Sequence, residues 1–117
     1  MITVREHRPW QAGRVIVVTE HRADEAFLPI ARELLEVLSR AAGFRSGQIA
    51  RSPDEPDTWL FVTHWADVGS MRRGFGSFDA KVAAAPVMLS AVDRVSAFET
   101  LLDVSPDGII ARGSDLA

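Results

Sequence analysis

The pattern of hydrophobic and polar positions divides the chain into extended and helical segments. Four segments carry β-branched or aromatic residues at alternating positions, which is typical of strands; they span residues 14–21 (RVIVVTEH), 44–51 (FRSGQIAR), 58–65 (TWLFVTHW) and 94–102 (RVSAFETLL). Between the first two, apolar residues recur at helical spacing from Phe27 to Ala41. A second helical region follows the third segment, so the predicted order is strand, helix, strand, strand, helix, strand.

Local signals place the ends of these elements. Gly43 follows the first helix as a stop signal, and residues 52–57 (SPDEPD) form a turn between two strands of an antiparallel hairpin. Asp67 and Ser77 are candidate N-caps of two helical pieces, and Pro86 is expected to interrupt the second piece. Pro29 is compatible with the first helix only in its first turn or at a kink.

The stretch from Thr58 to Asp67 is predicted to hold the central strand. Side chains alternate across a sheet, so one face carries Trp59, Phe61, Thr63 and Trp65 and the other Leu60, Val62 and His64. Both faces are mostly apolar, and we expect both to be covered.

This order of elements predicts an α+β chain with a ferredoxin-like, four-stranded antiparallel sheet and helices on one face. The strands carry few charges on either face, so a second copy is expected to cover the open face in a homodimer. The predicted domain spans residues 14–103. An N-terminal arm, residues 1–13 with Trp10, precedes it, and a loose C-terminal tail, residues 104–117, follows.

Composition narrows the classes of partner. There are 13 Lys and Arg against 16 Asp and Glu, a net charge of −3, which offers no electrostatic footprint for nucleic acid or an anionic membrane. The chain has no cysteine, which excludes disulfides and thiolate metal sites. No apolar run approaches the roughly 20 residues of a membrane span, and no secretory signal is evident, so a cytoplasmic location is expected.

Four segments of the sequence resemble the antibiotic biosynthesis monooxygenase family, which has a dimeric α/β barrel fold. They are RVIVVTEHR, the helix ending in AAGF, DTWLFVTHWADVGSMRRGFGS and SAFETLL, within residues 14–102. The resemblance implies a monooxygenase that oxidises an aromatic polyketide-like or quinol-like small molecule with molecular oxygen and without a cofactor. It also implies a pocket between sheet and helices, with a substrate wall next to Trp65 formed by Phe61, Thr63, Met71, Phe75, Phe78 and Phe98.

Four residues are candidates for chemistry. Trp65 either lines this pocket or ends the core, with its indole N–H bonded to a loop. His64 and His21 titrate near neutrality, and each is either a base or a hydrogen-bonded packing residue. Arg72, with its neighbour Arg73, either holds an oxyanion or lies on a solvated helix face. No metal site is expected, because the histidines lack acidic neighbours at ligand spacing.

Two other functions fit the same pattern, because a fold alone does not determine function. One is a non-catalytic dimer that binds a small apolar ligand or fills its pocket with its own side chains. The other is an isomerase or lyase on the same barrel, which needs only an acid or base.

Overall fold

The computed structural model describes residues 14–114. Its elements, in chain order, are β1 (Val15–Arg22), α1 (Phe27–Leu38), β2 (Phe44–Arg51), β3 (Thr58–Trp65), α2 (Val68–Gly76), α3 (Phe78–Met88), β4 (Ala97–Glu99), β5 (Leu102–Ser105) and β6 (Gly108–Ala111). The predicted arm, residues 1–13 with Trp10, lies outside the described residues.

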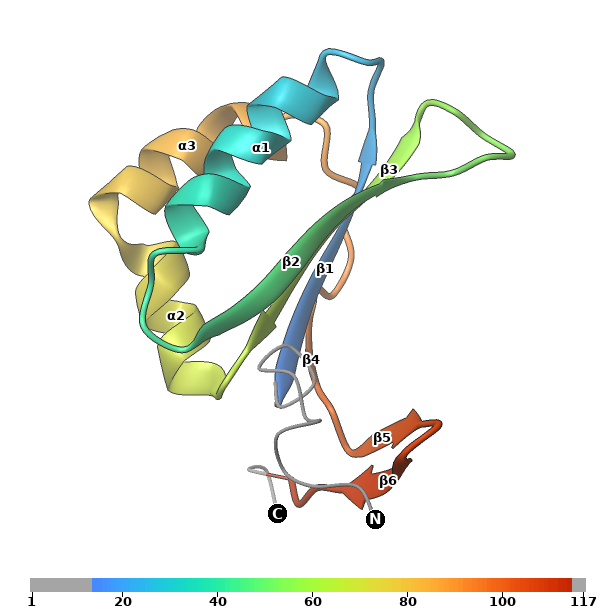
Figure 1. Ribbon diagram of the computed structural model, residues 1–117. Helices are drawn as coiled ribbons and strands as arrows, with labels where there is room; N and C mark the ends of the chain where they lie inside the picture. Colours follow the sequence, from blue (N-terminus) through green and yellow to red (C-terminus); the bar gives the residue numbers. More distant parts are fainter. Residues whose placement is uncertain (1–13, 115–117) are drawn as a thin grey trace.

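The main sheet is antiparallel with strand order β2-β3-β1-β4. β3 pairs along its whole length with β1, from Val15 opposite Trp65 to Arg22 opposite Thr58. The three helices lie on one side of this sheet (Figure 1). The ferredoxin-like arrangement and the central place of β3 are therefore confirmed.

The helix boundaries follow the predicted caps. The Asp67 carboxylate accepts a hydrogen bond from the Ser70 backbone N–H at 2.7 Å, which is the main cause of the lowered pKa of Asp67. Ser77 caps α3 through the Ala80 N–H. Gly43 has a φ of +86°, the left-handed conformation that glycine adopts most easily after a helix.

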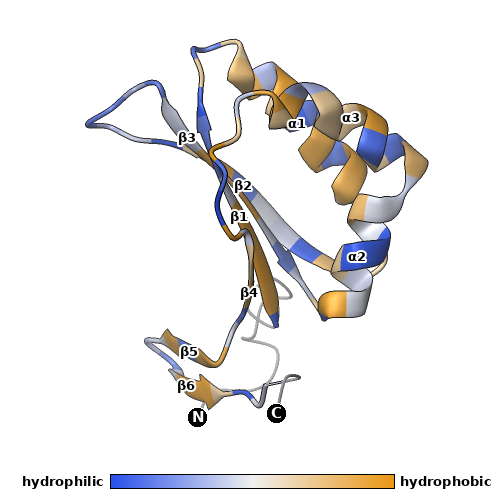
Figure 2. Cartoon of the chain, turned by 180° about the vertical axis from the view of Figure 1, so that it is seen from behind, coloured by the Kyte–Doolittle hydropathy of each residue, from blue (hydrophilic) through white to orange (hydrophobic). Residues whose placement is uncertain are grey.

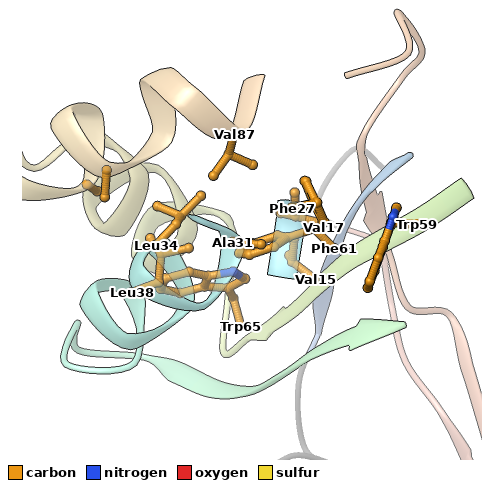
Figure 3. Packing of buried hydrophobic residues seen from close by; sticks show 12 residues of the cluster. Val15, Val17, Phe27, Ala31, Leu34, Leu38, Trp59, Phe61, Trp65 and Val87 are labelled. Atoms are coloured by element: carbon orange, nitrogen blue, oxygen red, sulfur yellow. The ribbon is translucent and has the colours of Figure 1, made fainter. Parts of the chain in front are cut away.

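The core lies between the helices and the sheet (Figure 3). Helix α1 presents Phe27, Ala31, Leu34 and Leu38, spaced by three or four residues. The sheet contributes side chains from alternate positions of its two central strands, and α3 adds three residues; these are Val15, Val17, Trp59, Phe61, Trp65, Ala80, Ala83 and Val87. The alternation predicted for β3 thus separates a buried face from an outer one.

The outer face of the sheet carries the other half of each strand's residues and has no helix on it. Cross-strand register places Leu60, Val62 and His64 of β3 on this face, next to β1, and Phe98 of β4 opposite Ile16. Leu60 and Phe98 are 39% and 50% exposed. We call this surface the open face.

Two predictions about the C-terminal third are wrong. The last strand of the sheet spans only Ala97–Glu99, because the pairing with β1 is continuous only there; Ala91 forms an isolated bridge to His21. The expected loose tail instead forms a two-stranded ribbon of β5 and β6, separate from the main sheet.

The prolines of the helices also differ in their effect. Pro29 lies in the first turn of α1, as required. Helix α3 continues through Pro86 to Met88, so Pro86 does not interrupt the helix as expected. Because Pro86 lies so close to the helix end, its missing N–H removes only one hydrogen bond. None of the helices between residues 14 and 114 is long and apolar enough to cross a membrane.

Candidate functional site

Trp65 is enclosed by side chains on all sides. It has no exposed surface, and its indole N–H donates a hydrogen bond to Thr63 Oγ1 at 2.8 Å. The rings of Phe44 and Phe75 contact it, with centroid distances of 5.4 and 5.7 Å. The indole is therefore held in one orientation by packing and by a buried hydrogen bond.

One side of this enclosure is very thin. Gly74 of α2 lies so close that a Cβ there would be 2.4 Å from Trp65 Cη2 and 2.7 Å from Cζ3. The same hypothetical Cβ would be 3.4 Å from the Cβ of Ala41. Two small residues thus cover the outer edge of the indole.

A groove of about 380 Å³ lies directly outside this cover. Ala41 and Gly74 line it together with Val37 and Ala42, and the polar part of its wall consists of Arg40, Arg73, Ser77 and Asp79. This volume is in the usual range for small-molecule sites. We call it the Trp65 groove.

The charged groups of the groove come from separate parts of the chain. Arg40 follows α1, Arg73 belongs to α2 and Asp79 to the first turn of α3. Arg73 donates a long hydrogen bond of 3.4 Å to Ser70 Oγ. Within residues 14–114, neither Arg40 nor Asp79 takes part in an ion pair.

A second hollow of about 450 Å³ continues the groove between α1 and α3. It shares Val37, Arg40 and Asp79 with the first hollow. Its further lining includes Phe78, which is 79% exposed, and Val82. The whole depression therefore has both arginines at its end near Trp65 and an extension along α3 whose wall also includes Glu33 and Glu36 of α1.

His64 lies on the opposite side of the sheet from Trp65. Adjacent residues of a strand point to opposite faces, and the pairing of His64 with Ile16 places it on the open face. Burial lowers its pKa from 6.5, and the nearby Asp103 carboxylate opposes this shift. His64 therefore cannot act on a molecule in the Trp65 groove.

His21 is fully buried at the other end of β1. Its Nδ1 is 3.1 Å from Ser90 Oγ, which itself donates to the Val87 carbonyl, and its Nε2 is 2.7 Å from Thr19 Oγ1. Because Ser90 uses its proton for Val87, this network fits a neutral ring with the proton on Nδ1. Burial has the largest influence on the pKa of His21 and lowers it from 6.5.

The structure brings together only part of the predicted site. Phe61 and Thr63 are buried beside Trp65 in the core, and Met71 and Phe75 pack against that core. His21 pairs with Trp59, six residues along β3 from Trp65, which is about 20 Å. Arg72 is exposed on α2 and does not line the groove.

Phe98 is the clearest difference from the predicted substrate wall. It pairs with Ile16 and therefore lies on the open face, across the sheet from the helices. The cause is the phase of β4, in which Ala97 and Glu99 share the side of Val15 and Val17. Of the six predicted wall residues, Phe78 alone lines the depression outside Trp65.

Sequence reasoning missed Arg40, Ser77 and Asp79 as members of a site. In the sequence, Ser77 stands out only as a helix cap, and Arg40 lies just before the stop signal at Gly43. The available signal was Gly74, a buried helical glycine next to Arg73, because such a glycine commonly marks close packing. The glycine alone does not indicate which residues at the end of α1 lie opposite Gly74.

The sequence profile of the antibiotic biosynthesis monooxygenase family matches residues 14–85, from β1 into α3 and including Trp65 and Gly74. The chain belongs to this family. Its ferredoxin-like fold is the one expected for an antibiotic biosynthesis monooxygenase domain. No curated protein is significantly similar to it in sequence.

Solved structures show the same fold at low sequence identity. SnoaB from Streptomyces nogalater, described as a cofactor-independent oxygenase, is 16% identical, with a TM-score of 0.67 over 75% of this chain and 93% of its own. A conserved protein from Methanosarcina mazei is 14% identical, with a TM-score of 0.64 and coverages of 80% and 97%. A protein from Shewanella oneidensis is 19% identical, with a TM-score of 0.63 and coverages of 76% and 92%.

Proposed function

We propose that this member of the antibiotic biosynthesis monooxygenase family is a cofactor-independent monooxygenase that oxidises a flat aromatic, polyketide-like or quinol-like molecule in the Trp65 groove. The observation that carries the proposal is the convergence of Arg40 and Arg73 outside the edge of the indole ring. The description of SnoaB as a cofactor-independent oxygenase supports the reaction type.

The proposed chemistry uses an electron-rich substrate anion. A methylene group between two aryl rings loses a proton, reacts with oxygen and becomes a carbonyl, while the second oxygen atom leaves as water. The substrate supplies all four electrons, so the balance needs no external reductant.

Each charged group of the groove has a role in this scheme. Asp79 accepts the proton, because its carboxylate lines the groove and has no ion-pair partner among residues 14–114. Arg40 and Arg73 stabilise the resulting anion by charge-assisted hydrogen bonds. In the extension along α3, the apolar side chains of Phe78 and Val82 hold the rest of the ring system.

The proposed enzyme is a homodimer joined through its open faces. Ile16, Val18, Leu60, Val62 and Phe98 form an apolar surface there, which a sheet with water on one side would not normally carry. Sizing with light scattering at micromolar concentration tests this part; a monomer would contradict it.

The filled interior supports a second candidate, a non-catalytic ligand-binding protein. Trp65, Phe61 and Thr63 are at most 2% exposed and leave no room for a ligand between sheet and helices at that point. In this case ligands would bind to the groove without turnover.

Substitution of Arg73, one of the two groove arginines, distinguishes the monooxygenase from the non-catalytic ligand-binding protein. Arg73→Gln is expected to reduce kcat/KM for an anthrone or hydroquinone about 10- to 100-fold, the effect of losing one or two charge-assisted contacts. Lys81→Gln removes the same charge from the exposed face of α3 outside either hollow and serves as the matched control. Ligand binding to the wild type without oxygen uptake would support the non-catalytic candidate.

A further inference from the structure

The C-terminal ribbon of β5 and β6 has its apolar side turned outward. Cross-strand pairing joins Leu102 with Ala111 and Val104 with Ile109, so these four residues share one face. All four are exposed, with Leu102, Val104 and Ile109 at 59%, 66% and 69%. The ribbon is orange, hence apolar, in the hydropathy view of Figure 2.

The polar side of the ribbon faces inward instead. Asp103, opposite Ile110, is partly buried and forms a 2.7 Å ion pair with Arg112. The Arg112 backbone N–H also bonds to the Leu101 carbonyl, which fixes the base of the ribbon. An ordinary surface hairpin has the reverse arrangement, with its apolar side against the domain.

The ribbon lacks the support that such an element needs. Among residues 14–114 its strands pair with no other strand, and it extends away from the helices beyond the end of β1 and β4 (Figure 1). A lone two-stranded hairpin is at best marginally stable in water. An exposed apolar face on such a hairpin therefore indicates that another surface covers it.

The open face has a matching recess at its opposite end. Two adjoining hollows, of about 190 and 270 Å³, share Glu20 and Leu60. Val18, Val95 and Phe98 supply the apolar wall of the smaller hollow, and the charged side chains of Arg94 and Glu20, which form an ion pair, lie at its rim. We call these two hollows together the Leu60 recess.

The ribbon does not fill this recess within its own chain, because none of its four apolar residues lines either hollow. It leaves the sheet beside Arg14, where the Thr100 N–H bonds to the Arg14 carbonyl. The recess extends from Phe98, opposite Ile16, to the pairing of Glu20 with Leu60, which is about 20 Å from Arg14 along β1. Two copies can pack open face to open face about a two-fold axis that lies between the sheets and runs perpendicular to the strands. The ribbon end of each sheet then lies over the recess end of the other.

We infer that the ribbon of each subunit packs its Leu102, Val104, Ile109 and Ala111 face into the Leu60 recess of a second copy of this chain. The inference rests on the proposed dimer and specifies how its subunits hold each other. The exposed large apolar side chains of the ribbon and recess, which range in exposure from 39% for Leu60 to 76% for Val95, supply on the order of 500 Å² per subunit. A standard interface buries about 800 Å² per partner, of which somewhat more than half is apolar.

Cysteine cross-linking tests the contact directly, because the natural chain has no cysteine. A Leu60→Cys, Val104→Cys double variant is expected to form a covalent dimer under mild oxidation, reversed by reductant. A Leu60→Cys, Leu89→Cys variant is the control, since Leu89 is 88% exposed on the helix side. Equal cross-linking of the two variants would overturn the inference.

Disruption of the ribbon gives a second, independent readout. Val104→Asp combined with Ile109→Asp is expected to raise the dimer dissociation constant at least tenfold with unchanged circular dichroism, whereas Leu89→Asp leaves it unchanged. A wild-type dimer that this double variant does not weaken would overturn the ribbon contact and leave the proposed dimer intact. A monomeric wild type would overturn both.

Discussion

The close approach of Gly74 to Trp65 allows a stability prediction with opposing terms. Replacement of Gly74 by alanine improves helix propensity by about 1 kcal/mol. The new Cβ, however, would lie 2.4 and 2.7 Å from two ring carbons, against an ordinary contact distance of about 3.5 to 4.0 Å. The outcome depends on whether the indole can move by about 1 Å.

The surroundings of the indole prevent that movement. Phe44 and Phe75 contact the ring, and the hydrogen bond to Thr63 fixes its nitrogen. Overpacking in such a rigid site typically costs about 1 to 3 kcal/mol, and we expect the upper part of this range. After the gain in propensity, Gly74→Ala should lower the free energy of unfolding by about 1 to 2 kcal/mol.

Gly76→Ala is the matched control, because it changes the same helix near its end and its Cβ would meet no atom within 4 Å. Its unfolding free energy should be unchanged or slightly raised. Urea unfolding at one protein concentration measures both, since dimer formation would make stability concentration-dependent. Equal stability of Gly74→Ala and the wild type would refute the packing argument at Trp65.

Two further predictions concern buried polar groups. Trp65→Phe removes the donor to Thr63 Oγ1 and leaves a void, so the unfolding free energy should fall by about 2 to 4 kcal/mol; a urea midpoint equal to that of the wild type would contradict this. Stability should also decrease as the pH falls below 6.5, because burial lowers the pKa of His21 and His64 and the unfolded chain then binds more protons. The slope is at most about 1.4 kcal/mol per pH unit for each histidine, and a flat profile between pH 5 and 7 in urea titrations would argue against it.

The fold was predictable because its signals are local. The alternation in β3, the caps at Asp67 and Ser77 and the stop at Gly43 each depend on a few neighbouring residues. The ribbon was also within reach, because residues 102–111 alternate around a Ser-Pro-Asp-Gly turn, a sequence with suitable turn chemistry. The low hydrophobic content of the surrounding tail obscured this pattern.

The groove was not predictable to the same degree. Arg40 lies after α1, Arg73 in α2 and Asp79 in α3, and their convergence depends on how closely α2 approaches Trp65. The side of the sheet on which Phe98 lies depends on the register between β4 and β1. Such long-range register and packing are not encoded in the period of any single segment.

Labelled oxygen distinguishes monooxygenation in the Trp65 groove from ligand binding without turnover. The purified protein is incubated with an anthrone under ¹⁸O₂ without added cofactor, and uptake is measured against buffer and against Arg73→Gln. We expect one labelled atom in the carbonyl product, the other in water, and a rate above buffer that falls in Arg73→Gln but not in Lys81→Gln. Oxygen uptake equal to buffer across anthrones and hydroquinones would contradict it.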